Sequence, residues 1–321
     1  MSKFVTQRNF GFGKQMDWAG HQALKNLYGR GHFATVASHA QRWRQFCHWA
    51  RSSHGINDAC AIDQSLLENY AADLAERVEE ETLAVSYAQN LIVSANITLE
   101  ALRQDKTIRI ESPASWVGKR QTVRTRVPDG IDWPDIGRLV ARLRQNNLER
   151  AAIIVLLCRS FGIRLREAIL ASLADWQRQA RERGQIDIRK GTKGGRGKEV
   201  ERWVPVNERG RVALREAVQV RNQLGGQNLL RPDETFDDLV NDGEVHRARM
   251  ILHEFGIKGY HELRAAWACE RYEEISGAAA PVLQEGKSLG QQNDDQFRLN
   301  LARELGHDRI DVVAAYIGAR P

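Results

Sequence analysis

Six side chains spread over residues 164–316 are of the types that act on phosphate esters. In chain order they are Arg164 in "FGIRLREA", Lys193 in "GTKGGRGK", His261 and Arg264 in "YHELRAAWA", His307 in "ELGHDR" and Tyr316 in "AAYIG". Guanidinium groups bind phosphate oxygens through paired donors and stay charged at neutral pH. A tyrosine hydroxyl can be a nucleophile that forms a covalent intermediate. These types predict covalent chemistry on a phosphodiester, with Arg164 and Arg264 binding its non-bridging oxygens.

The order and spacing of the six residues resemble those of the tyrosine recombinases, the phage-integrase and Xer-like family of site-specific DNA recombinases. The family pattern has an arginine in Gly-x-Arg-x-x-Glu, a lysine on a β-hairpin, His-x-x-Arg, Leu-Gly-His, and then a tyrosine. Here Gly162, Arg164 and Glu167 fit the first element, and Tyr316 follows His307 by nine residues, which is the family's spacing. One departure is the alanine after Arg264, where many relatives have histidine.

The resemblance implies a role for each residue. Tyr316 would attack the scissile phosphate and form a 3′-phosphotyrosine, and Lys193 would protonate the leaving 5′-oxygen. His261 would assist proton transfer at the tyrosine, and His307 would hydrogen-bond the phosphate and support the tyrosine helix. Because the covalent link conserves the energy of the phosphodiester, we expect no cofactor, neither ATP nor a divalent metal.

Two of these assignments have alternatives in the sequence. Lys190 and Lys198 flank Lys193, which we prefer because it comes first in "KGGR" and so fits the family's turn. Tyr316 could instead be a packed aromatic. However, aliphatic residues at i, i+3 and i+7 already predict the buried stripe of its helix, namely Ile310, Val313 and Ile317. We therefore expect Tyr316 to lie off that buried face.

Other catalytic motifs are incomplete. "GTKGGRGKE" lacks the glycine and the serine or threonine that a phosphate-binding loop needs at positions 192 and 199. "HEFG" and "HELR" lack the second histidine of a zinc protease. The four cysteines are scattered without a C-x-x-C pair, which favours a reduced protein without structural zinc.

Hydrophobic periodicity predicts a mainly α fold with a small β-hairpin (α+β). We expect an N-terminal extension (1–30), a helical SAM-like core-binding domain (31–110), a basic linker (111–131) and a tyrosine-recombinase catalytic domain (132–321). The alternation on either side of residues 189–198 predicts that this cationic loop forms the tip of the hairpin. Residues 275–294 read as an insertion, which would be either a subunit contact or a surface loop.

The excess positive charge is concentrated in two segments. The net charge is +6, and residues 117–127 and 189–198 carry cations without acids. Such runs can follow a DNA backbone. The candidate phosphate contacts are Lys119, Arg120, Arg124, Arg126, Lys190, Arg196 and Lys198.

The sequence therefore predicts a site-specific integrase that acts in the integration or excision of a mobile element. The expected partners are double-stranded DNA with paired recombination sites, three further copies of the chain in a homotetramer, and accessory DNA-bending or directionality proteins. No apolar run of transmembrane length and no signal peptide pattern is present, so we expect a cytoplasmic, nucleoid-associated protein and no membrane partner. The alternatives are a type IB topoisomerase-like enzyme that relaxes DNA and a non-catalytic DNA-binding relative.

Overall fold

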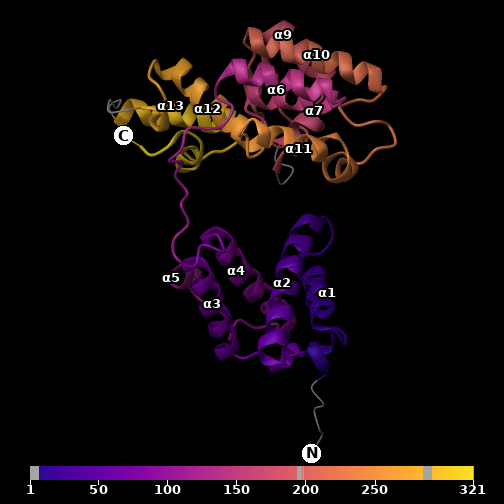
Figure 1. The fold of residues 1–321 in the computed structure, drawn as a ribbon, viewed down its shortest axis with the longest axis vertical. Helices are drawn as coiled ribbons and strands as arrows, with labels where there is room; N and C mark the ends of the chain where they lie inside the picture. The colour runs from indigo at the N-terminus through magenta and orange to yellow at the C-terminus, as the bar shows by residue number, and fades with distance from the viewer. Residues whose placement is uncertain (1–6, 194–196, 198, 285–290, 321) are drawn as a thin grey trace, which may run out of the picture. The chain divides into compact units, whose positions relative to one another are not determined.

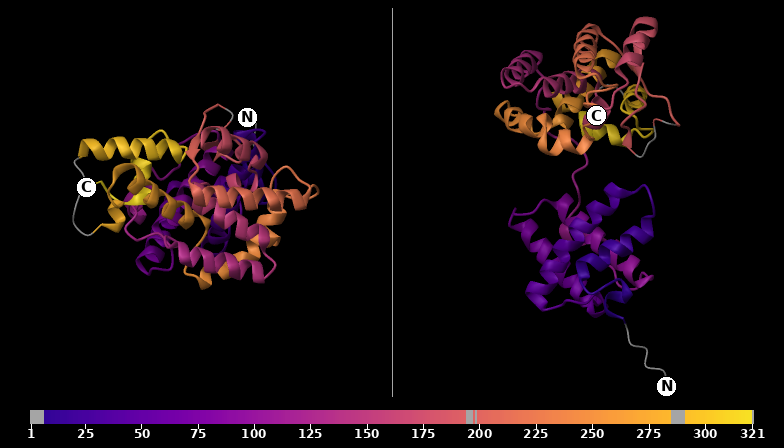
Figure 2. Two further views of the ribbon diagram at one scale, coloured as in Figure 1. Left: turned by 90° about the horizontal axis from the view of Figure 1, so that it is seen from above. Right: turned by 90° about the vertical axis from the view of Figure 1, so that its right-hand side faces the viewer.

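The computed structural model of the chain divides into two compact units, Met1–Gln121 and Thr122–Pro321 (Figure 1). The structure describes residues 7–193, 197, 199–284 and 291–320, except the side chains of 291 and 292. Within the described residues, no helix is long and apolar enough to cross a membrane. Residues 118–132 form neither helix nor strand, as two further views show (Figure 2).

The first unit is helical, and its core includes a helix from the segment predicted as an N-terminal extension. Its helices are α1 (Met16–Tyr28), α2 (Phe33–His54), α3 (Gln64–Glu79), α4 (Val85–Arg103) and α5 (Pro113–Val117). Helix α1 packs against α2 and α4. The buried indole of Trp43 in α2 donates a 2.9 Å hydrogen bond to the carbonyl of Met16. The first helix is therefore part of this unit's core rather than an appendage to it.

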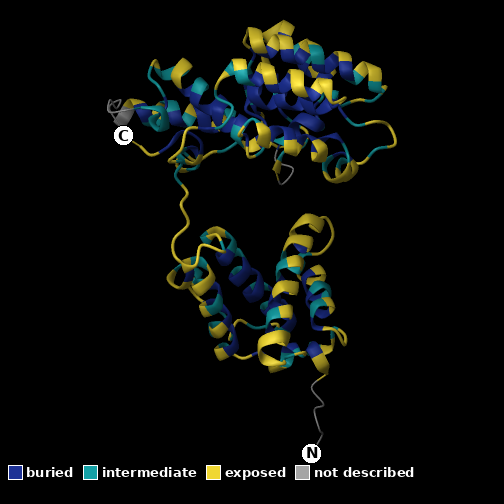
Figure 3. Ribbon diagram, in the orientation of Figure 1, coloured by how far each residue is buried: buried dark blue, intermediate teal, exposed yellow. Residues whose placement is uncertain are grey.

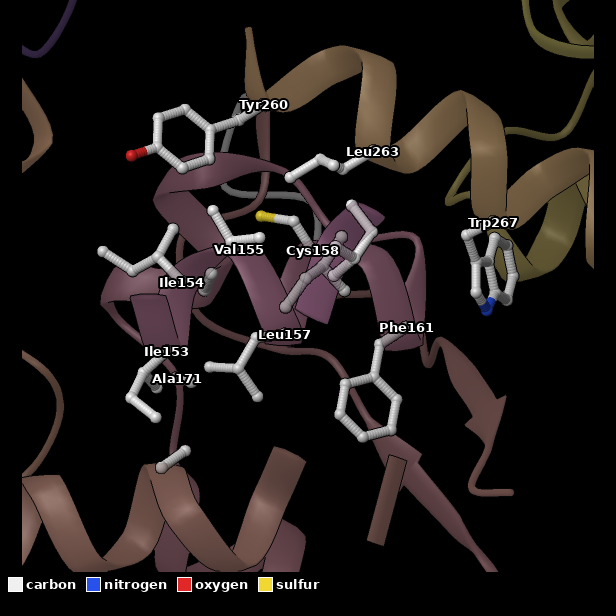
Figure 4. Close-up of a cluster of buried hydrophobic side chains, with 14 of the residues drawn as sticks. Ile153, Ile154, Val155, Leu157, Cys158, Phe161, Ala171, Tyr260, Leu263 and Trp267 are labelled. Carbon is white, nitrogen blue, oxygen red and sulfur yellow. The ribbon is translucent and has the colours of Figure 1, made fainter. Parts of the chain in front are cut away.

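The second unit packs its helices around α7 (Glu149–Phe161), which is buried on nearly all sides (Figure 3). The other helices are α6 (Trp133–Gln145), α8 (Leu165–Ile169), α9 (Leu173–Arg183), α10 (Glu208–Leu224), α11 (Glu244–Glu254), α12 (Tyr260–Ser276), α13 (Gln291–Glu304) and α14 (Ala314–Ile317). Helices α6, α10 and α12 lie against α7. Figure 4 shows the contact with α12, where Leu263 and Trp267 face Cys158 and Phe161.

The predicted hairpin forms a two-stranded antiparallel sheet of β1 (Gln185–Asp187) and β2 (Trp203–Pro205). Ile186 pairs with Val204, and both side chains are buried, so the alternating pattern correctly predicted the strands. The loop between the strands begins at Ile188 and includes Lys193, while residues 194–196 and 198 lie outside the described part.

Gly162 ends α7 at a sharp turn against α12, two residues before the catalytic candidate Arg164. Its φ is +60°, and a Cβ built on it would lie 2.0 Å from the Trp267 ring. A residue with a side chain would therefore meet both backbone strain and a steric clash. The glycine allows the chain to turn sharply against α12 and to present Arg164 two residues later.

We expect the Gly162→Ala substitution to lower the free energy of unfolding by roughly 2–4 kcal/mol, because strain and overpacking add. Gly184→Ala is the matched control, since Gly184 also ends a helix at positive φ (+66°), but a Cβ added there would meet no described atom within 4 Å. That variant should lose only about 1 kcal/mol. Equal losses in urea unfolding would contradict the role assigned to Trp267.

Candidate active site

A fully buried arginine lies at the centre of the site. Arg264 on α12 is 0% exposed, and each nitrogen of its guanidinium donates a hydrogen bond to a different segment. Nη1 donates to the Gly162 carbonyl, Nη2 to the Leu305 carbonyl, and Nε to the Tyr316 hydroxyl at 3.3 Å. The guanidinium therefore connects the end of α7, the Leu-Gly-His turn and the tyrosine helix.

Glu167 on α8 is the carboxylate that three guanidiniums share. It is 0% exposed and lies 2.8 Å from Arg164 Nη1, 2.9 Å from Arg202 Nη1 and 3.8 Å from Arg264 Nη1. Burial raises the pKa of Glu167, but the charges of Arg202, Arg264 and Arg164 outweigh burial and hold it below its ordinary value. Glu167 therefore stays ionised, and the cluster keeps an excess of positive charge.

Oε1 of Glu167 binds the side chains of Arg164 and Arg202, and Oε2 fixes the backbone of Arg164. It accepts a 2.7 Å hydrogen bond from the Arg164 amide, as in the capping box that begins α8. The Arg164 side chain then reaches His307, with Nη2 3.2 Å from Nε2 of the imidazole. Since a guanidinium only donates, Nε2 of His307 is the acceptor in this pair. Residues 143 positions apart in sequence thus meet at one surface.

A pocket of about 550 Å³ opens at this surface. Arg164, Lys193, Arg202 and His307 all line it. Lys193 lies in the exposed loop of the hairpin and lines the pocket. Lys190, the other described lysine of that loop, does not line it. Arg303 and Arg309 line it as well, together with the acids Glu167, Glu201 and Asp308. The five cations outnumber the three acids, and this excess favours an anion at the opening.

Tyr316 lies behind the pocket rather than in its lining. The side chain is 4% exposed, and Ile310 is only partly buried, so the prediction that the tyrosine lies off the buried face is wrong. The reason is local: the chain forms a short 3-10 segment (Asp311–Val313) before the four-residue α14, which rotates Tyr316 inward relative to one continuous helix. The ring lies 5.2 Å from the His261 ring and 6.2 Å from the His307 ring, measured between centroids.

The electrostatic environment changes the acidity of two site residues. Desolvation and the nearby charge of Arg264 lower the pKa of His261, although the residue as a whole is exposed. This favours a neutral imidazole beside Tyr316, as a proton acceptor must be. Burial and the charge of Arg202 lower the pKa of Arg264 to about 10, so its guanidinium still carries a charge at neutral pH.

The seven predicted phosphate contacts differ in their surroundings. Lys119, Arg126 and Lys190 are exposed, whereas Arg196 and Lys198 lie outside the described residues. Arg120 donates to the side chain of Asn90 at 2.7 Å in the first unit and remains exposed. These four residues, Lys119, Arg120, Arg126 and Lys190, keep accessible charge.

Arg124 has a different environment from the one expected of a linker residue. Its guanidinium is ion-paired with Glu262, its side chain is 13% exposed, and its backbone amide donates to the Ala314 carbonyl at 2.9 Å. The paired charge is not available to a phosphate in this arrangement. Arg124 instead attaches the start of the second unit to the tyrosine segment.

The predicted insertion at 275–294 is partly integrated into the unit. Ala280 is buried, and Val282 lies so close to Gly318 that a Cβ on the glycine would approach it to 3.0 Å. The start of α13 contributes Asp294, which is buried and binds Arg298 at 2.7 Å. Those described parts of the segment support the tyrosine end of the chain instead of forming a plain surface loop.

The sequence analysis missed Arg202 as a site residue. Arg202 lies at the parity of the buried Val204 and Val206, so the alternation already pointed its side chain inward. A charge on the inward face of a strand requires a buried partner, and this signal could have identified it. No group of three potential metal ligands occurs among the residues described.

Residues 123–270 match a family model described as Integrase. No curated protein sequence matches the chain.

Solved structures with similar folds include three integrase complexes with DNA. A lambda integrase dimer bound to a COC' core site has a TM-score of 0.55 at 16% identity, covering 92% of this chain and 75% of that one. A lambda integrase tetramer bound to a Holliday junction gives 0.51 at 16%, covering 86% and 76%. The Tn1549 transposon integrase in complex with transposon right end DNA gives 0.52 at 13%, covering 94% and 95%. At these identities the likeness concerns the fold, and it confirms the mainly helical architecture with one small sheet.

The ionised state of Glu167 gives a pH-dependent contribution to stability. Its folded-state pKa is below the unfolded value near 4.5, so the contribution is complete above that pH and is lost as pH falls through the folded value. We expect the difference in melting temperature between the wild type and Glu167→Gln to be largest at pH 7 and to shrink below about pH 4.5. Glu182→Gln, at an exposed position, is the control and should show a small difference throughout. A pH-independent difference for Glu167→Gln would contradict the assignment.

Proposed function

Because residues 123–270 match the integrase family, as the sequence pattern predicted, we propose that the chain is a site-specific tyrosine recombinase that cuts and rejoins duplex DNA. The observation that carries the proposal is the hydrogen bond between Arg264 and the Tyr316 hydroxyl. It brings the expected nucleophile to one of the two guanidiniums that would bind the phosphate. The second guanidinium, that of Arg164, shares Glu167 with the first.

The proposed reaction is a transfer of the phosphoryl group from DNA to Tyr316 and back. The phenolic oxygen forms a bond to phosphorus, and the bond from phosphorus to the 5′-oxygen breaks. His261, kept neutral by its surroundings, accepts the phenolic proton, and Lys193 gives a proton to the leaving oxygen. Rejoining reverses these transfers with a 5′-hydroxyl from another strand as the nucleophile, so bonds and protons balance without a cofactor.

The arginines supply the electrostatic part of catalysis. Negative charge grows on the non-bridging oxygens in the transition state, and donors held in advance at those oxygens stabilise it most. Glu167 keeps Arg164 oriented before DNA arrives, and the carbonyls of Gly162 and Leu305 do the same for Arg264. An excess of guanidinium over carboxylate in a buried cluster favours binding of an anion.

The buried position of Tyr316 implies that DNA binding precedes exposure of the nucleophile. Without DNA, Nε of Arg264 donates a hydrogen bond to the Tyr316 hydroxyl. A bound phosphate would accept this hydrogen bond instead and so release the hydroxyl for attack. Catalytic hydrogen bonds commonly take their final geometry only in the substrate complex. Because α14 has only four residues, few backbone hydrogen bonds would have to rearrange when Tyr316 becomes exposed.

The DNA partner is supported by the exposed cations and by what the structural relatives bind. Lys119, Arg126 and Lys190 are accessible for phosphate contacts, which give affinity that falls steeply with salt. The lambda integrase structures contain core-site or Holliday-junction DNA in a dimer or tetramer, and the Tn1549 integrase structure contains a transposon end. We infer that this chain likewise assembles as a tetramer on paired sites and moves a mobile element.

The Tyr316→Phe substitution should abolish the covalent protein–DNA adduct while leaving DNA affinity within about twofold, because only the attacking oxygen is lost. The measurement is denaturing electrophoresis after incubation with a library of nicked duplexes, whose cleaved end fragment diffuses away and traps the adduct. Adduct formed by Tyr316→Phe would contradict the nucleophile assignment. Absence of adduct in the wild type with intact DNA binding would favour the non-catalytic relative, and relaxation of plasmids without partner exchange would favour the topoisomerase.

The Lys193→Ala substitution should slow cleavage by about 100-fold or more, as expected for loss of a general acid. A substrate with sulfur in place of the bridging 5′-oxygen should restore the rate, because a thiolate leaves without a proton. Lys190→Ala is the matched control in the same loop. At saturating DNA it should cleave both substrates at close to the wild-type rate, because a phosphate contact contributes to affinity rather than to proton transfer. Rescue of Lys190→Ala rather than Lys193→Ala would transfer the assignment to Lys190.

A further inference from the structure

Arg202 is a charged residue that points inward from the position directly before strand β2. The side chain is 5% exposed, and its backbone amide donates a 2.9 Å hydrogen bond to Asp187 across the hairpin. It precedes β2 directly, and so its place is fixed by the pairing of Asp187 with Trp203. Whatever holds Arg202 therefore also holds the end of the loop that carries Lys193.

The guanidinium of Arg202 joins two parts of the active site. Its Nη1 donates to Glu167 at 2.9 Å, on the same oxygen that Arg164 binds. Its Nε donates to the Glu304 carbonyl at 2.7 Å, at the end of α13 and three residues before His307. One side chain thus bridges the carboxylate that orients Arg164 and the turn that presents His307.

The Leu-Gly-His turn is shaped around Arg202. Gly306 has φ +70°, and a Cβ built on it would lie 3.1 Å from Cδ and 3.3 Å from Nε of Arg202. Glycine at position 306 therefore permits both the left-handed backbone conformation and the close approach of the Arg202 side chain. With this contact the guanidinium limits where His307 can lie.

The cost of burying Arg202 indicates a purpose beyond packing. Its Nη2 is a buried donor without a hydrogen-bond partner among the described residues, and an unsatisfied buried donor is destabilising. Burial and the nearby charge of Arg164 lower the pKa of the Arg202 guanidinium, although the carboxylate of Glu167 acts in the opposite direction. A hydrophobic residue of similar size would fill such a position with less cost. Unfavourable arrangements of this kind are typical of functional sites.

We propose that Arg202 is a positioning residue of the phosphate site, which holds Arg164 through Glu167 and His307 through the Glu304 carbonyl. The proposal rests on the strand-transfer function proposed above. Arg202 also lines the pocket, but the role proposed for it acts through Glu167 and the Glu304 carbonyl and requires no contact between Arg202 and the DNA. It acts by keeping the two groups that meet the phosphate at 3.2 Å from each other before the substrate binds.

The test compares single-turnover rates of adduct formation at saturating DNA on two substrates. One has an ordinary scissile phosphate and the other a methylphosphonate, which is neutral and needs less guanidinium stabilisation. We expect Arg202→Met to slow the first reaction by about 10–100-fold, as for other residues that orient reacting groups. The defect should shrink to about threefold or less on the methylphosphonate. Arg202→Lys, which keeps the charge but cannot bridge both partners, should lie between.

Arg150→Met is the matched control for a structural effect. Arg150 is also buried and bound to two carboxylates, Glu234 and Glu244, and it does not line the pocket. It should lower stability without changing the ratio of rates on the two substrates. The double substitution of Arg202 and Arg164 to methionine should be less than additive, because part of the effect of Arg202 acts through Arg164 and only the part that acts through His307 remains. A wild-type rate for Arg202→Met, or an equal defect on both substrates, would overturn the proposal.

A second readout does not depend on catalysis. In the DNA-free protein, the Nε–H resonance of Arg164 and the ring resonances of His307 should shift in Arg202→Lys and stay unchanged in Arg150→Lys. Unchanged resonances in Arg202→Lys would reject the positioning role even if the chain proves to be an enzyme. Shifted resonances in a chain that forms no adduct would instead refute the proposed function and retain the positioning role.

Discussion

The interaction on which the site depends is the buried carboxylate of Glu167 with the guanidiniums of Arg164, Arg202 and Arg264. Three like charges would not remain this close without it, and one carboxylate neutralises only part of their charge. The remainder is what an incoming phosphate would meet. The same carboxylate caps the helix that begins at Arg164, so backbone geometry and charge balance are set by one residue.

Backbone constraints bring this interaction within reach of Tyr316, the nucleophile proposed above. Gly162 allows α7 to end against Trp267, and its carbonyl then accepts from Arg264. Arg264 passes the constraint to Tyr316 through one hydrogen bond. Tyr316 is buried in the chain without DNA, so the structure keeps its hydroxyl away from solvent. In the mechanism proposed above, DNA binding therefore has to uncover this hydroxyl before it can react.

The sequence was sufficient for the parts of the site that depend on local order. Side-chain types, a strand alternation and fixed short spacings predicted the hairpin and the six candidate residues, all of which have direct contacts with one another or line the pocket. Properties that depend on distant partners were not predictable in this way. The inward turn of Tyr316 depends on a 3-10 segment that helical periodicity does not encode, and the pairing of Arg124 depends on Glu262, which is 138 residues away. The burial of Arg202 was visible only as a charge at an inward-facing position of the hairpin, because its carboxylate partner, Glu167, comes from helix α8.

The approach of Arg202 to Gly306 also has an evolutionary consequence. The two positions are far apart in the chain, yet a methyl group at 306 would compete for the space of the arginine stem. A lineage that replaced the arginine by a smaller residue would relieve the steric part of the constraint on the glycine, leaving only the backbone preference. Substitutions at 202 and 306 should therefore be correlated among descendants of this sequence, and a change at the glycine should be tolerated only after the arginine has gone.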